Sequence, residues 1–166
     1  MCIRDRIELI VTLSVMAIFT GAITVSVGDI NSSTRLSNAA SQALADVRYG
    51  QELAMAHRRE VDVIINVGGD YYEIRWHDDG TYVPSPYGSG DAKVQFGTGD
   101  FSDVSIISTQ FSTRLSFTST GQPLQNGGSF SNPLSIMLLN SKIHVVVYSS
   151  GYSALEEIVG TGGCGC

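Results

Sequence analysis

The sequence has 166 residues, of which 43% are hydrophobic and only 16% are charged, and its formal net charge at neutral pH is −6. This apolar content is enough to form a core and excludes a disordered acidic chain. The acidic balance argues against a general nucleic-acid-binding protein, and three cysteines are too few for a dense disulfide scaffold.

The first predicted element is an apolar segment between Ile7 and Val27. Its 21 residues are apolar, glycine, serine or threonine, except for Glu8. A helix of this length spans roughly 30 Å, the thickness of the hydrocarbon core of a bilayer, so we predict a transmembrane helix. A buried core helix and a cleaved secretory signal are the alternatives. A signal should have a shorter apolar region and no carboxylate at its start.

Helical periodicity continues beyond this segment. Apolar and small residues recur at spacings of four and three, at Leu36, Ala40, Ala43, Val47, Gly50 and Ala54. The charged residues expected to flank or oppose this stripe are Arg35, Asp46, Arg48, Glu52 and Arg58. We therefore predict one helix from about Ile7 to Arg59, whose second half, residues 28–59, packs its stripe on a globular head.

From Val61 the period of the apolar residues changes to two, which indicates β-strands separated by Gly- and Ser-rich turns. The predicted strands are 61–67, 71–76, 93–96, 104–107, 115–118, 134–139 and 143–148. One helix followed by short strands predicts an α+β fold, in which a long N-terminal helix packs on a C-terminal head of antiparallel β-sheet. The head is expected over residues 60–153, with a long loop at 84–103 and a flexible tail at 154–166.

The stretch from Ile7 to Ile18, IELIVTLSVMAI, resembles the N-terminal helix of type IV pilins and type II secretion pseudopilins. In that family a prepilin peptidase removes a short basic leader and methylates the new N-terminus. A glutamate just inside the mature chain neutralises the terminal amine of a neighbouring subunit during filament assembly, and the resemblance assigns this role to Glu8. The residues implied in membrane and helix packing are Ile7, Leu9, Ile10, Leu13, Met16, Ile18 and Phe19.

Residues 1–6 depart from the family pattern, because no Gly-Phe-Thr-Leu precedes Ile7. We expect residues 1–6 to be a non-native or leader-remnant prefix. Further along, 43–59, 115–123 and 145–152 resemble the GspH/FimT branch of the family, with a Phe-x-x-x-Gly-x-Pro turn and a closing strand that ends in Gly and an aromatic residue.

The resemblance implies a structural minor pseudopilin of a type II protein secretion system. Such a protein is held in the bacterial inner membrane by a single pass, with its head in the periplasm, and is incorporated into a pseudopilus. Its implied partners are other pseudopilins or pilins, a prepilin peptidase and the inner-membrane assembly platform. A FimT-like minor pilin of a type IV pilus, active in adhesion, motility or DNA uptake, fits the same helix. A membrane-anchored periplasmic enzyme or binding protein is the third interpretation.

No catalytic or cofactor-binding pattern occurs in the sequence, so we predict neither an enzyme nor a cofactor. The three histidines, His57, His77 and His144, are scattered along the chain. Asp78-Asp79-Gly80 offers oxygen ligands for calcium, and the loop that contains Asp91, Asp100 and Asp103 is a second candidate. The spacing of an EF-hand is absent, so plain turns are favoured at both places.

Cys164 and Cys166 lie in a Gly-rich C-terminal segment, for which a flexible end and a disulfide between chains are both considered. Nucleic-acid binding is not expected, because acidic residues outnumber basic ones by 13 to 8 after residue 30. Arg58-Arg59 is the one basic pair, and it is expected to end the helix favourably against the helix dipole.

Overall fold

The computed structural model describes residues 3–88, 90–108, 113–140 and 142–157. Side chains are described for 8–18, 31–88, 90–107, 113–137, 139–140 and 142–157. The chain forms two compact units, Met1–Thr34 and Arg35–Cys166.

A single helix, α1, runs from Ile3 to His57 and confirms the predicted N-terminal helix. Its C-terminal end is a Schellman motif, in which the backbone N–H of Arg59 donates to the carbonyl oxygen of Ala54 at 3.2 Å. Arg58 adopts a left-handed conformation with φ of 51°. An arginine therefore occupies the position that glycine usually takes at a helix end.

The part of α1 in the second unit buries one face. Its buried apolar residues, each at most 5% exposed, are Leu36, Ala39, Ala40, Ala43, Val47 and Ala54. Most of these side chains are small, so the helix backbone approaches the strands closely. The predicted stripe is thus the face that packs on the head.

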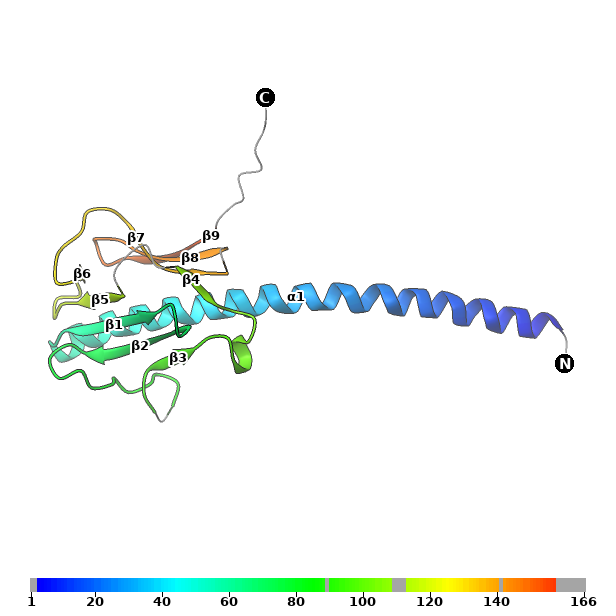
Figure 1. Cartoon of the computed structure of the whole chain (residues 1–166), viewed down its shortest axis with the longest axis horizontal. Coiled ribbons are helices and arrows are strands. Elements are labelled where there is room, and N and C mark those ends of the chain that lie inside the picture. The colour runs from blue at the N-terminus through cyan, green and yellow to red at the C-terminus, as the bar shows by residue number, and fades with distance from the viewer. Residues whose placement is uncertain (1–2, 89, 109–112, 141, 158–166) are drawn as a thin grey trace, which may run out of the picture. The chain divides into compact units, whose positions relative to one another are not determined.

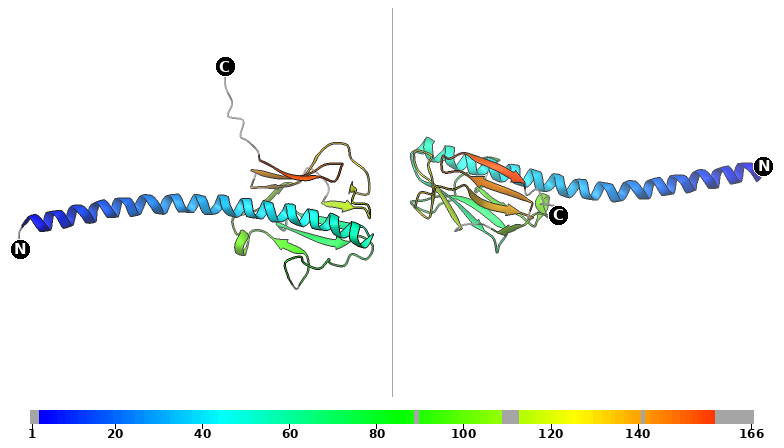
Figure 2. Two further views of the ribbon diagram at one scale, coloured as in Figure 1. Left: turned by 180° about the vertical axis from the view of Figure 1, so that it is seen from behind. Right: turned by 90° about the horizontal axis from the view of Figure 1, so that it is seen from above.

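The head contains two antiparallel sheets, and Figures 1 and 2 show them on the second half of α1. The first sheet has the order β3-β2-β1-β5-β6 and the second has the order β4-β7-β8-β9. The strands are β1 Val61–Asn66, β2 Tyr71–Trp76, β3 Lys93–Gln95, β4 Ile106–Ser108, β5 Arg114–Phe117, β6 Pro123–Gln125, β7 Leu134–Leu139, β8 Ile143–Val147 and β9 Ser153–Glu157. A short 3-10 helix, η1 Gly99–Phe101, follows β3. The predicted α+β architecture, a helix followed by antiparallel sheet, is confirmed.

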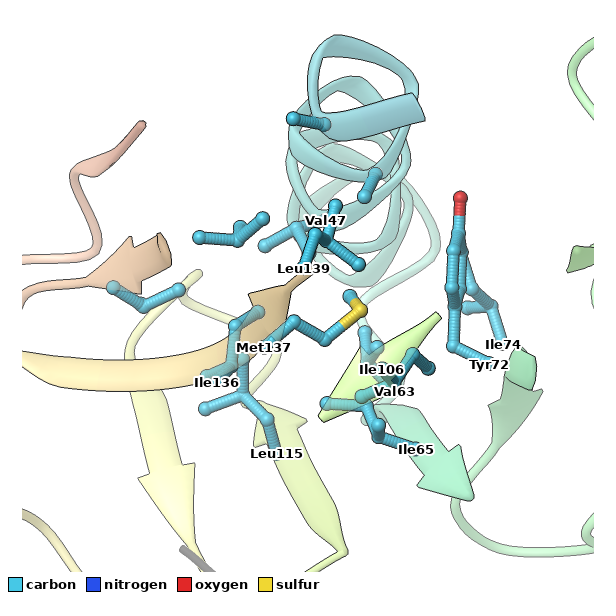
Figure 3. Close-up of a cluster of buried hydrophobic side chains, with 14 of the residues drawn as sticks. Val47, Val63, Ile65, Tyr72, Ile74, Ile106, Leu115, Ile136, Met137 and Leu139 are labelled. Atoms are coloured by element: carbon cyan, nitrogen blue, oxygen red, sulfur yellow. The ribbon is translucent and has the colours of Figure 1, made fainter. Parts of the chain in front are cut away.

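One apolar core joins α1 to both sheets. Figure 3 shows Val47 of α1, Val63 of β1 and Met137 of β7 converging, and all three are at most 1% exposed. Tyr72 of β2 and Phe117 of β5 are the largest side chains of the first sheet buried in the same cluster. Burial of this apolar surface is the main source of stability for the second unit.

The structure contains two strands that the sequence did not predict. Residues 154–157, expected to begin a flexible tail, form most of β9, and Leu155 pairs with Val145 of β8. Strand β6 pairs with β5 where only a turn was expected. The remainder of the expected tail, residues 158–166, lies outside the described residues and includes Cys164 and Cys166.

Two hairpin turns of the head have the same geometry. In the turns at 118–122 and 148–152, the fourth residue donates its N–H to the carbonyl of the first, and the first donates to the carbonyl of the fifth. The fourth residue is Gly121, with φ of 80°, in one turn and Gly151, with φ of 86°, in the other. This is a three-residue hairpin whose left-handed position favours glycine. The structure therefore gives a backbone reason for both glycines of the motifs at 115–123 and 145–152.

Side chains bond to the backbone at both edges of the second sheet. Arg48 of α1 donates from Nη2 to the carbonyl oxygen of Ser153 in β9 at 2.8 Å. At the opposite edge, the N–H of Ile106 in β4 donates to Oδ1 of Asp70 at 2.8 Å. Asp70 lies in the turn between β1 and β2, so this bond also connects the two sheets.

Candidate assembly surface

The described N-terminal part of α1 presents an apolar surface. Its large apolar side chains are between 46% and 72% exposed: Leu9, Ile10, Val11, Leu13, Val15, Met16 and Ile18. We call these seven residues the apolar surface. Contiguous exposed apolar area of this kind marks a contact with lipid or with another protein.

The hydroxyl groups within the apolar surface bond to the helix itself. Thr12 Oγ1 donates to the carbonyl oxygen of Leu9 at 3.0 Å, and Ser14 Oγ donates to that of Ile10 at 2.7 Å. Such bonds satisfy hydroxyl groups that would be costly to bury in an apolar environment. They suit a surface that is covered by apolar groups rather than by water.

Glu8 is exposed and lies at the N-terminal end of the apolar surface. It is the only charged residue among the described side chains of the first unit, which are 8–18 and 31–34. Glu8 thus lies on the same described helix segment as five of the predicted packing residues, which are Leu9, Ile10, Leu13, Met16 and Ile18. The side chains of Ile7 and Phe19, predicted for the same surface, lie outside the described ones.

Within the part of the chain whose side chains are described, no helix combines the length and apolar character needed to cross a membrane. The transmembrane helix predicted for 7–27 is therefore not confirmed by the structure.

Three of the carboxylates considered for calcium, Asp78, Asp79 and Asp103, have other partners. Arg59 donates from Nε to Oδ2 of Asp78 at 3.1 Å and from Nη2 to Oδ2 of Asp79 at 3.2 Å. The bond from Arg59 holds the pKa of Asp78 below its usual range, and bonds from Thr81 do so for the pKa of Asp79. In the second candidate loop, Asp103 pairs with Arg35 at 3.1 Å. Across the described ranges, no three His, Cys, Asp or Glu side chains are grouped to hold a metal ion.

The three histidines lie in separate contacts of the head. His57 packs edge-on against Trp76, with 5.3 Å between ring centroids. His77 Nδ1 lies 3.0 Å from Oδ1 of the buried Asp62, and His144 Nδ1 lies 2.6 Å from Oγ of the buried Ser135. Each ring is thus held by a local structural contact.

An open groove of about 430 Å³ lies between the end of α1 and the turn before β9. It is lined by Arg48, Gln51, Glu52, Met55, Gly151, Tyr152 and Ser153. Arg48 and Gln51 already donate to the carbonyl oxygens of Ser153 and Gly121, each at 2.8 Å. These contacts attach the helix to β9 and to the turn that contains Gly121, and we assign the groove no ligand.

The prediction that Asp46 lies beside or opposite the packing stripe is wrong. Asp46 is only 3% exposed and faces β2, where the Tyr72 hydroxyl donates to its Oδ2 at 2.6 Å. Burial raises the pKa of Asp46 above its ordinary value, while the hydrogen bond from Tyr72 works in the opposite direction. Burial also raises the pKa of Tyr72, and the charge of Asp46 adds to this effect.

We expect Asp46→Asn to raise the melting temperature of the protein at neutral pH and to weaken the pH dependence of that temperature. The folded state binds a proton at Asp46 more readily than the unfolded state, whose pKa is about 3.9. The contribution of Asp46 to stability therefore falls as pH rises from about 3.9 through the raised pKa, and stays low above it. Thermal melts of both proteins between acidic and neutral pH measure this. A lower melting temperature for Asp46→Asn at neutral pH would contradict the assignment.

No protein-family model and no curated protein matches the sequence. Among solved structures, the fold is similar to that of the minor pseudopilin EpsH from the type 2 secretion system of Vibrio cholerae. The TM-score is 0.54 at 10% identity, and the match covers 74% of this chain and 96% of EpsH. Two crystal structures of the type IV minor pilin FimU from Pseudomonas aeruginosa give TM-scores of 0.44 and 0.42, both at 17% identity. They cover 75% and 72% of this chain and 90% and 91% of FimU.

The helix-and-two-sheet architecture is therefore a pilin-like α+β fold. More particularly, it is the type IV pilin-like fold of the minor pseudopilins, as the likeness to EpsH shows. This confirms the fold expected from the resemblance of the N-terminal helix.

Proposed function

We propose that the chain is a minor subunit of a pilin-like filament, and specifically a structural minor pseudopilin of a type II secretion system. The apolar surface at the start of α1 carries this proposal, because seven large apolar side chains are exposed on a helix that belongs to a pilin-like fold. Helices of neighbouring subunits would cover that surface in the filament. The likeness to EpsH, a minor pseudopilin, favours the secretion filament over a type IV pilus.

Glu8 is proposed to set the register between subunits. At the end of the apolar surface, an ionised carboxylate is costly unless it is paired. The terminal ammonium group of a neighbouring subunit is a suitable partner, because one ion pair then relieves two charges in an apolar environment. Axial position is fixed at the same time, since a shift by one helical turn would separate the charges by about 5 Å.

Before assembly, residues 7–27 are proposed to anchor the chain in the bacterial inner membrane, with the head that follows α1 lying in the periplasm. The back-bonded Thr12 and Ser14 support this proposal, since lipid offers no hydrogen-bond partners. Processing by a prepilin peptidase and contact with the assembly platform belong to the same proposal. The chain would act by packing rather than by catalysis.

Site-specific photo-crosslinking tests the filament role. The chain, preceded by its native upstream sequence, carries a photoreactive amino acid at Ile10 or Leu13 in cells that produce the filament proteins. The control position is Thr98, which is exposed on the head. We expect adducts with other pilin-like subunits from positions 10 and 13, and mass spectrometry of these adducts identifies the secretion or pilus machine. Adducts with lipid alone, in cells that contain assembled filaments, would rule out the role.

A further inference from the structure

The face of the first sheet that points away from α1 carries a group of charged side chains. Val63 of β1 packs toward Gly50 of α1, so the alternate residue Asp62 lies on the opposite face of the sheet. Residues paired directly across antiparallel strands share a face, and the register therefore places four more charged residues beside Asp62. We call the resulting set the charged face, and it consists of Asp62, Glu73, Arg75, Lys93 and Arg114.

The charged face is layered, with its carboxylates beneath its cations. The side chains of Asp62 and Glu73 are 1% and 6% exposed, whereas those of Arg75 and Arg114 are 32% and 46% exposed. Arg75 Nε lies 2.8 Å from Oε1 of Glu73, and Arg114 Nη2 lies 3.0 Å from Oδ2 of Asp62. Lys93 is exposed as well. A partner that touches this face therefore meets positive charge, although the whole chain is acidic.

Two of these cations are also held against tyrosine rings. Arg75 Cζ lies 4.3 Å from the ring centroid of Tyr82, and Arg75 Nη2 donates to the hydroxyl of the same residue at 2.8 Å. Lys93 Nζ lies 3.9 Å from the ring centroid of Tyr71. Long side chains that are already ordered lose less conformational entropy when a partner binds. Arginine and tyrosine are also enriched in protein–protein interfaces, so the composition of this face fits a protein partner.

We propose that the charged face docks a carboxylate-bearing surface of a neighbouring filament subunit, an inference that rests on the proposed function. Guanidinium groups bind carboxylates through two parallel hydrogen bonds, which makes such contacts directional as well as attractive. In a filament, the packed helices would hold neighbouring heads at a high effective concentration. A few ion pairs between the heads are then enough to align them.

Separate carboxylates on a protein fit this face better than a continuous polyanion. Binding to nucleic acid or to an anionic membrane depends on a surplus of positive charge, and here two carboxylates offset two of the three cations. At the margin of the face, Oε2 of the partly exposed Glu60 lies 3.6 Å from Nε2 of His77 and adds negative charge. A carboxylate on a protein surface is able to approach one exposed cation at a time and to avoid Glu60.

Site-specific photo-crosslinking from Leu124 tests the docking surface. Leu124 of β6 pairs with Ser116, which pairs with Asp62, so this uncharged and partly exposed residue lies beside the charged face. The chain, preceded by its native upstream sequence, carries the photoreactive amino acid at position 124 in cells that produce the filament proteins. We expect an adduct with a pilin-like subunit, which mass spectrometry maps to a segment rich in Asp and Glu. The docking surface is disproved if the adducts contain only lipid, nucleic acid or proteins outside the filament, if they map to a segment without carboxylates, or if none forms.

Charge reversal on the face gives the second measurement. Arg114→Glu and Lys93→Glu should each lower the yield of the adduct roughly fivefold or more, because they place negative charge against a negative partner. Lys142→Glu is the matched control, since it reverses an exposed charge next to β8 of the second sheet and should leave the yield unchanged.

Thermal melts followed by the fluorescence of Trp76, the one tryptophan of the sequence, report whether each variant stays folded. Arg114→Glu removes a partner of the buried Asp62, whereas Lys93→Glu leaves the ion pairs of Asp62 and Glu73 in place. If Arg114→Glu does not fold, Lys93→Glu decides, and an unchanged yield of the adduct would overturn the proposal.

The crosslinks from positions 10 and 13 separate this proposal from the filament role. Subunit adducts from those two positions, together with none from position 124, would disprove the docking surface and leave the filament role standing. The absence of subunit adducts at all three positions would remove both.

Discussion

Replacing Leu13 by glutamate is expected to abolish incorporation of the chain into filaments. Leu13 is 59% exposed in the middle of the apolar surface. A charged side chain at the centre of a membrane-embedded helix costs about 2.5–3.5 kcal/mol, and each subunit of an assembly would bear this cost. The amount of the chain in sheared filaments, measured by immunoblotting, gives the result.

Two comparisons make this experiment specific. Leu13→Met keeps an apolar side chain of similar volume and should assemble almost normally. The unfolding temperature of the head should be equal in both variants, because Leu13 belongs to the first unit and the core cluster of the head lies beyond Thr34. Normal incorporation of Leu13→Glu would show that the apolar surface does not mediate assembly.

The largest loss of stability is expected for Gly151→Ala. Gly151 has φ of 86°, and a Cβ atom there would collide with Nε2 of Gln51 and lie 3.2 Å from the carbonyl oxygen of Gly121. Left-handed strain costs about 1–2 kcal/mol, and displacing Gln51 from its bond to Gly121 adds about 1–3 kcal/mol. We therefore expect a total loss of roughly 3 kcal/mol, measured by denaturant unfolding.

Gly127→Ala separates the two causes of that loss. Gly127 has a similar φ of 79°, but a Cβ atom there would meet nothing within 4 Å. Its substitution should therefore cost only the left-handed strain, about 1–2 kcal/mol. Equal losses at the two positions would mean that the contact between α1 and the glycine turns adds nothing to stability.

The main elements of the fold could be predicted because their apolar periods are strong. The spacing of four and three from Leu36 to Ala54 located the packing face of α1. Alternation from Val61 onward located β1, whose inner residues Val63 and Ile65 are at most 1% exposed. These patterns are local, so they are visible in the sequence without knowledge of the tertiary structure.

Strands β6 and β9 were missed because pairing, rather than a local pattern, creates them. β6 has only three residues and begins with a proline. A signal was nevertheless present next to it, since Asn126-Gly127 is a favoured two-residue turn and both residues have positive φ. β9 ends in two glutamates, and its register with β8 provides the order that its composition does not predict.

The candidate site was predicted only as far as motif and periodicity reach. Glu8 and its apolar neighbours follow from the N-terminal motif, and their role stays a prediction. Asp46 was misplaced because its charge suggested exposure, although its spacing from Ala43 and Gly50 puts it on the packing face. Tyr72, which supplies its hydrogen bond, lies 26 residues away, so no local pattern shows the pair.

The side-chain hydrogen bonds at the two edges of the second sheet affect what happens when many heads are crowded together. Arg48 and Asp70 occupy backbone groups of β9 and β4 that another strand would otherwise pair with. Edge strands blocked in this way resist strand addition between copies, the first step toward cross-β aggregates. Heads brought side by side at very high local concentration can therefore meet through their side chains and still separate as folded units.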